Sequence, residues 1–231
     1  RSVLQARLDG HGGMLAVAES AEKVSNWIIE NSLKLDIAAV NSPISCTVSG
    51  SLEDIELLHK YARSMHCSSI RLNVNVPYHN FFMDNFKEEM HERLQKISPK
   101  NSYIPFYSTV YGRKNDNDLS LDSSYWFDNA RKTVKFKDAL ENAARDDYTL
   151  FLEIGPSPVL SSSMHEILQK DQISAGVIPS LNRRVPEKDA LARLLARLAV
   201  EGIELDWSRV VSGKRVDLPS YPWNREYVWL E

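Results

Sequence analysis

Histidine is the side chain best suited to proton transfer near neutral pH, and this chain has six of them. His79 stands out because it directly follows a segment that alternates like a strand, in the order Val76-Pro77-Tyr78-His79-Asn80. Folds with α/β architecture place reacting groups where a strand opens into a loop. We therefore predict that His79 is a general acid or base, while capping of the following helix is the alternative. The other histidines fall in predicted helices or in a glycine-rich turn and are typical of surface residues: His11, His59, His66, His91 and His165.

No nucleophile motif accompanies this histidine. The sequence contains no Gly-x-Ser-x-Gly elbow, no phosphate-binding loop, no His-Glu-x-x-His and no dinucleotide fingerprint. The glycines of Gly10-His11-Gly12-Gly13 precede a predicted strand rather than follow one, which is the wrong context for a dinucleotide. Cys46 and Cys67 have neither metal-site spacing nor the number needed for a disulfide framework. This cysteine usage favours a reducing compartment and predicts no metal site.

The elements before His79 follow from hydrophobic periodicity. Residues 14–76 predict strands and helices in the order β-α-β-β-α-β, which is typical of a ferredoxin-like unit that closes a small sheet by itself. Ser51 and Asp54 have the spacing of a helix capping box. Residues 69–76 alternate strictly between polar and apolar, as in a half-buried strand. The predicted strands are 14–18, 35–40, 46–49 and 69–76, and the predicted helices are 21–31 and 51–65.

After His79, strands alternate with helices, a pattern that predicts a parallel sheet covered on both faces. The polar segment 112–120 predicts a mobile loop, and a late helix carries Leu191, Leu194, Leu195 and Leu198 on one face. The predicted strands are 104–110, 150–154 and 175–179, and the predicted helices are 81–97, 136–144 and 160–169.

Composition places the chain among ordinary globular proteins. It has 231 residues, 43% of them hydrophobic, and a net charge of −3 from 28 basic and 31 acidic side chains. This balance gives no broad basic face for nucleic acid, and no apolar run approaches the roughly 20 residues of a membrane span. We expect a cytoplasmic protein, or a piece of one, with no nucleic-acid or membrane partner.

Five segments along the chain carry a resemblance to a known family. They are Gly12-Gly13-Met14-Leu15-Ala16-Val17, the stretch from Asn41-Ser42-Pro43 to Val48-Ser49-Gly50, the stretch 105–136, Phe151-Leu152-Glu153-Ile154-Gly155-Pro156-Ser157-Pro158, and the tail 216–229. In this order they resemble the acyltransferase domain of modular type I polyketide synthases with the linker that follows it. The resemblance to malonyl-CoA:acyl-carrier-protein transacylases is more distant.

The resemblance implies an α/β fold in which a ferredoxin-like small subdomain, residues 14–76, joins part of an α/β-hydrolase-like parallel-sheet subdomain, residues 77–185. Residues 1–13 would end a helical segment of the large subdomain, and residues 186–231 would form a C-terminal helix and linker. The implied reaction moves a malonyl-type unit from CoA to the phosphopantetheine of an acyl carrier protein, without a metal or organic cofactor. In this family a serine in a Gly-His-Ser-x-Gly elbow is the nucleophile and a histidine, here His79, is its general base.

Further site residues also follow from the resemblance. Arg1 would hold the free carboxylate of the extender unit, a task that suits a planar, permanently charged guanidinium. Tyr78 and Asn41 would bind the substrate, and the Tyr78 ring should crowd an α-methyl group, which favours malonyl over methylmalonyl by about 1–3 kcal/mol. The main-chain carbonyl of Lys135 would orient His79 and leave Nε2 as the proton acceptor.

The family's elbow serine has no counterpart in this sequence, so we expect no acyl-enzyme from this chain alone. One hypothesis is a transferase portion that completes its site with the missing N-terminal half of the domain. A second is a non-catalytic docking or structural remnant, against which the presence of His79 and Arg1 argues. A third is an acyl-thioester hydrolase, which shares the first half-reaction.

The C-terminal segment predicts a contact surface. Its large apolar residues lie on a stretch with little regular structure and should pack on this domain or on a neighbour. The resemblance implies that the neighbour is a ketosynthase domain. The residues concerned are Leu218, Tyr221, Trp223 and Trp229.

Overall fold

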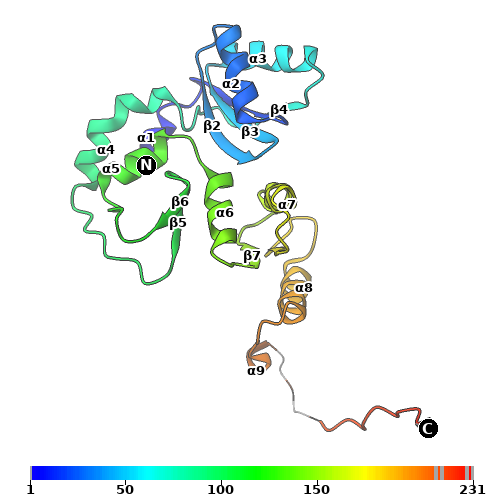
Figure 1. Cartoon of the computed structure of the whole chain (residues 1–231). Coiled ribbons are helices and arrows are strands. Elements are labelled where there is room, and N and C mark those ends of the chain that lie inside the picture. Colours follow the sequence, from blue (N-terminus) through cyan, green and yellow to red (C-terminus); the bar gives the residue numbers. More distant parts are fainter. Residues whose placement is uncertain (1, 211–212, 214–215, 227–228, 230–231) are drawn as a thin grey trace.

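The computed structural model describes residues 2–210, 213, 216–226 and 229. It is a mixed α/β structure with a four-stranded sheet and two helices at one end (Figure 1). The middle of the chain forms a helical layer and two small strand pairs, and the C-terminal stretch runs away from both. Arg1 lies outside the described residues, so its predicted role as a carboxylate ligand stays a prediction.

The four-stranded sheet is antiparallel throughout, in the order β2-β3-β1-β4. Helices α2 and α3 pack on one face of it, and the elements follow one another along the chain in the order predicted from the sequence. Their bounds are β1 (Gly13–Val17), α2 (Ala21–Glu30), β2 (Leu35–Ser42), β3 (Ser45–Gly50), α3 (Leu52–Ser64) and β4 (Ser69–Arg71).

Alternation along the strands decides which side chains meet the helices. Leu15 of β1 and Val48 of β3 are fully buried against α2 and α3, whereas their neighbours Met14 and Ser49 point to the opposite face. Both helices begin at a serine whose hydroxyl accepts a backbone N–H three residues on, as the capping-box spacing of Ser51 predicts. The sheet is therefore apolar on its helix-covered side and is left with a second face for other contacts.

The strand predicted over 69–76 is shorter in the structure. Only Ser69–Arg71 pairs as β4, and beyond it the backbone N–H of Val74 bonds the carbonyl of Leu72 at 2.8 Å. Such a tight turn takes the chain out of the ladder with β1. Residues 72–76 thus form an irregular exit that leads to His79, although their polar–apolar alternation is that of a strand.

A second layer of helices packs around the exit from the sheet. The predicted helix 81–97 is split into a 3₁₀ helix and a shorter α-helix, and the sequence patterns missed α5. The elements are α1 (Ser2–Ala6), η1 (Phe81–Phe86), α4 (Lys87–Leu94) and α5 (Ser123–Arg131). They share a buried cluster made of Leu4, Leu8, Val76, Met83, Met90, Phe127 and Ala130.

The predicted parallel sheet is only partly present among the described residues. Strands β7 and β8 pair in parallel, whereas β5 pairs antiparallel with β6, which lies in the segment predicted to be a mobile loop. Tyr107 pairs with Lys114, so the turn between them closes a hairpin. The remaining elements are β5 (Phe106–Ser108), β6 (Arg113–Asn115), α6 (Phe136–Arg145), β7 (Leu150–Glu153), α7 (Ser161–Lys170), β8 (Gly176–Pro179), α8 (Glu187–Val200) and α9 (Trp207–Val210).

Among the described residues 216–226 of the C-terminal segment, the large apolar side chains are exposed. Leu218 is 82% exposed and Trp223 is 74% exposed, and the chain runs outward from α8 and α9 in Figure 1. Packing of these side chains against their own domain, one of the two predicted arrangements, is therefore not what the structure has. Within the part of the chain that the structure describes, no helix is long and apolar enough to cross a membrane.

Glu153 links the parallel strand pair to α7. Its carboxylate accepts hydrogen bonds from the backbone N–H groups of Val159, Leu160 and Ser161, at 2.7–2.9 Å, and from the Ser161 hydroxyl at 2.6 Å. Burial acts to raise the pKa of Glu153, but these four hydrogen bonds to the charged form outweigh it and hold the pKa below its ordinary value of 4.5. The ionised carboxylate is thus a structural group at the start of α7.

Replacing Glu153 with Gln should lower the free energy of unfolding at neutral pH by about 1–3 kcal/mol, because buried donors lose a charged acceptor. A carboxyl with a lowered folded pKa stabilises the fold above its unfolded pKa and stops doing so as the pH falls through the folded value. The difference between parent and Glu153→Gln should therefore shrink below pH 4.5, which denaturant unfolding at several pH values measures. Glu56→Gln, at an exposed ion pair with Arg71, is the control and should change little. An equal loss at all pH values would contradict the assignment.

Candidate active site

His79 lines an open pocket of about 560 Å³ where three parts of the chain meet. Tyr78 precedes it on the same loop, and Met14 comes from the face of the small sheet that α2 and α3 leave uncovered. Ser2 and Gln5 are contributed by α1. Two residues predicted from the sequence, His79 and Tyr78, are thus brought to one pocket.

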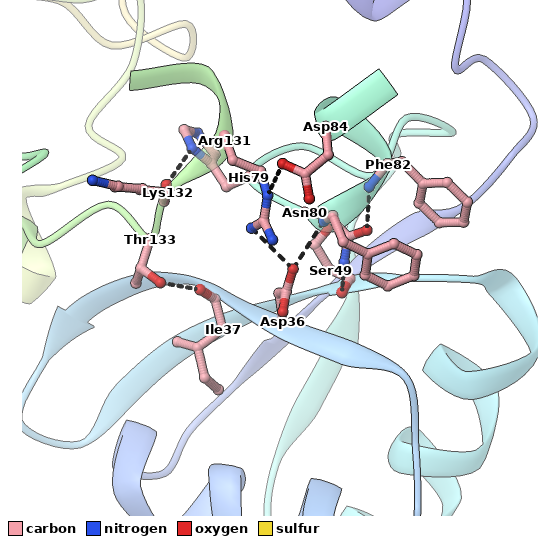
Figure 2. Close-up of polar contacts among 11 residues, drawn as sticks. Asp36, Ile37, Ser49, His79, Asn80, Phe82, Asp84, Arg131, Lys132 and Thr133 are labelled. Atoms are coloured by element: carbon pink, nitrogen blue, oxygen red, sulfur yellow. Dashed lines mark hydrogen bonds and ion pairs between the residues drawn. The ribbon is translucent and has the colours of Figure 1, made fainter. Parts of the chain in front are cut away.

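The ring of His79 is oriented by a main-chain carbonyl. Its Nδ1 lies 2.9 Å from the carbonyl oxygen of Lys132 (Figure 2). Because a carbonyl can only accept, Nδ1 carries the proton of this hydrogen bond. In the neutral ring Nε2 is then the nitrogen with the lone pair, as a general base requires.

The predicted orienting residue, Lys135, is wrong by three positions. The carbonyl of Lys135 accepts the N–H of Ala139 in the first turn of α6, so it is engaged in the helix. Lys132 ends α5 in an extended conformation, with ψ of 159°, and its carbonyl is turned out of the helix towards His79. The role of a main-chain carbonyl is as the resemblance implied, but its residue is Lys132.

The segment that follows Lys132 is fastened to β2. Val134 donates its N–H to the carbonyl of Ala38 at 2.8 Å and accepts the N–H of Val40 at 2.9 Å. The Thr133 hydroxyl donates to the carbonyl of Ile37 at 2.7 Å. These contacts hold the His79-orienting carbonyl against the edge of the small sheet.

His79 itself has a backbone conformation that needs support. Its φ is +56°, in the left-handed region that costs most L-residues free energy. The next residue, Asn80, is fully buried, donates its side-chain N–H to the carbonyl of Ser49 at 2.8 Å and accepts the N–H of Phe82 at 3.2 Å. One side chain thus fastens the loop to β3 and caps η1, so the capping role that was the alternative for His79 belongs to Asn80.

Gln5 is a pocket residue that the sequence patterns did not indicate. It is 6% exposed, and its Nε2 has no hydrogen-bond partner among the described residues. Asn41, predicted to bind substrate, lies at the C-terminal end of β2, where its amide donates to the Thr47 hydroxyl at 3.0 Å. It is not among the residues that line this pocket. Of the other histidines, His59 and His91 each share a hydrogen bond with a serine hydroxyl.

The cysteines do not supply a nucleophile. Burial raises the pKa of the Cys46 thiol to about 12, and burial together with the charge of Glu19 raises that of Cys67. Thiols in this state stay protonated and inert at neutral pH. In the described ranges there is no cluster of three or more His, Cys, Asp or Glu side chains that could hold a metal ion.

Comparison with known proteins identifies the family of the chain. The family model described as the acyl transferase domain matches residues 1–205. The chain belongs to the acyltransferase domain family of polyketide synthases. It is 34% identical over its whole length to polyketide synthase GfsB of Streptomyces halstedii, and 32% identical to erythronolide synthase EryA2 of Saccharopolyspora erythraea. It spans only 4% and 6% of the length of these synthases.

Solved acyltransferase structures agree with this assignment. The acyltransferase domain from module 8 of the salinomycin polyketide synthase is 29% identical and superposes with a TM-score of 0.85, over 90% of this chain and 49% of that one. A malonyl CoA-acyl carrier protein transacylase from Clostridium perfringens, at 24% identity and a TM-score of 0.72, shares the fold. This acyltransferase domain chain thus corresponds to about half the length of the salinomycin domain.

Replacing Asn80 with Asp tests the anchoring of the loop that carries His79. A carboxylate cannot donate to the Ser49 carbonyl, so Asn80→Asp should reduce the free energy of unfolding by about 2–4 kcal/mol at neutral pH, as measured by urea denaturation. The matched control is Asn31→Asp, where the amide also donates to a main-chain carbonyl at 2.8 Å but at an exposed helix end. We expect a loss below about 1 kcal/mol for the control. Equal losses in the two variants would refute an anchoring role for Asn80.

Proposed function

We propose that this chain supplies the general base and the acyl-binding side of an acyltransferase that moves a malonyl-type unit from CoA to the phosphopantetheine thiol of an acyl carrier protein. The nucleophilic serine would come from the part of the synthase outside this chain. The observation that carries the proposal is the hydrogen bond from His79 Nδ1 to the Lys132 carbonyl, in a histidine that lines a pocket. The reaction needs no metal or organic cofactor.

In the first half-reaction, Nε2 of His79 takes the proton of the serine hydroxyl as the serine oxygen attacks the thioester carbonyl. The tetrahedral intermediate collapses, the carbon–sulfur bond breaks, and the histidine returns its proton to the leaving CoA thiolate. In the second half-reaction, the same nitrogen accepts the proton of the phosphopantetheine thiol, which attacks the acyl-serine. The second tetrahedral intermediate collapses, the ester carbon–oxygen bond to the serine breaks, and the histidine returns its proton to the serine oxygen, so the protein ends unchanged.

Malonyl is the extender unit that we propose. Tyr78 and Met14 give the pocket two large side chains. On the resemblance, a ring at the position of Tyr78 disfavours an α-methyl branch. The free carboxylate of the extender is assigned to Arg1 on the resemblance alone. A ketosynthase domain is the proposed neighbour of the exposed tail.

The alternative is a non-catalytic docking portion of such a domain. The observation that favours it is the exposed apolar tail, in which Tyr221 is 71% and Trp223 is 74% exposed. A purely structural role, however, gives no reason for a pocket histidine whose tautomer is set by a carbonyl. A hydrolase differs from the proposed transferase only in the acceptor, water instead of a thiol.

Replacing His79 with Ala in the complete synthase module should lower the rate of malonyl transfer to the carrier protein by about 10²–10⁴-fold, because the serine loses its general base. Intact mass spectrometry of the carrier protein over time measures the transfer. His91→Ala is the control, since His91 also uses Nδ1 but bonds the Ser123 hydroxyl away from the pocket. Transfer at the parental rate by His79→Ala would exclude the proposed mechanism and favour the docking role, while release of free malonate in the parent would indicate a hydrolase.

Replacing Tyr78 with Ala should relax the choice of extender unit. Removing the ring should raise methylmalonyl relative to malonyl transfer by about 10-fold, within the range that one apolar contact contributes. Competition between the two CoA esters in the same module gives the ratio directly. Tyr61→Ala, which removes a ring packed on Trp27 in the small subdomain, should leave the ratio unchanged. An unchanged ratio in Tyr78→Ala would remove this residue from the specificity site.

A further inference from the structure

Arg131 lies at the centre of the polar contacts behind His79. Its Nε donates to Asp84 Oδ1 at 2.8 Å, and its Nη1 donates to Asp36 Oδ2 at 3.2 Å (Figure 2). Asp84 belongs to η1, which follows His79, and Asp36 belongs to β2. One planar guanidinium therefore joins α5, η1 and the small sheet, and it fixes the directions of its donors on separate nitrogens, which a rotating ammonium does not.

Both partners of the His79 hydrogen bond depend on these contacts. On the histidine side, the same Asp36 Oδ2 that receives Arg131 also accepts the N–H of Phe81 at 2.9 Å, two residues after His79. On the carbonyl side, Arg131 immediately precedes Lys132, whose carbonyl bonds Nδ1. The guanidinium thus spans the gap between the His79 loop and the end of α5.

We propose that Arg131 is a positioning residue that sets the tautomer of His79 by holding its loop and the Lys132 carbonyl at hydrogen-bonding distance. The residue acts through His79 and does not touch substrate, so the proposal rests on the proposed role of His79 for its functional meaning. The tautomer itself is a property of the chain and can be measured without any reaction.

The experiment is nuclear magnetic resonance of the chain with ¹⁵N-labelled histidine, in mildly alkaline buffer where imidazole is neutral. Long-range ¹H–¹⁵N correlations show which ring nitrogen carries the proton, and the His79 signals are assigned by their loss in His79→Gln. We expect the Nδ1–H form in the parent. In Arg131→Met, which keeps an unbranched apolar stem and removes the donors, the Nδ1–H population should fall at least about two-fold in favour of Nε2–H.

Two controls separate positioning from stability. Arg93→Met also removes a guanidinium with two hydrogen bonds, both of them to the Glu89 carboxylate, at 2.7 and 3.0 Å. It should leave the His79 tautomer as in the parent. Tyr61→Ala removes a ring packed on Trp27 in the small subdomain, away from the guanidinium and from the Lys132 segment, and should lower the melting temperature with the tautomer unchanged. If Arg131 acted only through stability, the Nδ1–H population of His79 would fall in every variant whose melting temperature is lowered.

A folded Arg131→Met chain in which His79 keeps the Nδ1–H form would overturn the proposal. If that variant is unfolded, Arg131→Lys takes its place, because it keeps the charge between Asp36 and Asp84 but not the two separate donors. A parental tautomer in the folded Lys variant would also overturn it. In the complete module, Arg131→Met should lower kcat about 10-fold with KM within about two-fold. A tautomer shift together with full activity of His79→Ala would uphold the positioning role and reject the proposed function.

Discussion

The hydrogen bond between His79 Nδ1 and the Lys132 carbonyl joins residues that are 53 positions apart, and most of the structure around it serves to keep that distance short. A single hydrogen bond contributes only about 1 kcal/mol to stability, so it cannot hold the two segments together by itself. The small sheet does so instead. The Ser49 carbonyl of β3 accepts a hydrogen bond from Asn80, and the backbone of β2 forms hydrogen bonds with Val134. Both segments are therefore attached to the same sheet. The geometry of this hydrogen bond thus depends on a sheet whose apolar core is packed against α2 and α3.

This division explains why the sheet has two different faces. The face towards α2 and α3 buries Leu15, Val17 and Val48 and supplies much of the stability of this part of the chain. The opposite face carries Met14 into the pocket, and the Ser49 carbonyl of β3 accepts a hydrogen bond from Asn80 of the His79 loop. The apolar cluster therefore supports the left-handed backbone of His79, a conformation that would not persist in an isolated loop.

Side-chain patterns predicted the elements better than they predicted the contacts. Short runs of strand length located β1 to β3, and the strand-end position of His79 pointed to the residue that lines the pocket. The first strand of the hairpin β5–β6 was predicted, but the second, Arg113–Asn115, was interpreted as a loop because it is short and polar. The orienting carbonyl was placed at Lys135 instead of Lys132, since every residue has a carbonyl and none has a sequence signature. Gln5 was missed for a similar reason, because an amide on a short helix follows no pattern.

The ion pairs of Arg131 show that stability and geometry are separate demands on the same residues. The side chains of Asp36 and Arg131 are 34% and 26% exposed, and that of Asp84 is 55% exposed. Pairs this accessible to water contribute about 0–1 kcal/mol to folding, so folding alone gives little reason for a guanidinium at this position. The guanidinium does fix orientation, because its two donors lie in one plane and constrain the Asp36 and Asp84 carboxylates at once. An interaction that is weak in stability can therefore still decide which nitrogen of a neighbouring histidine carries the proton.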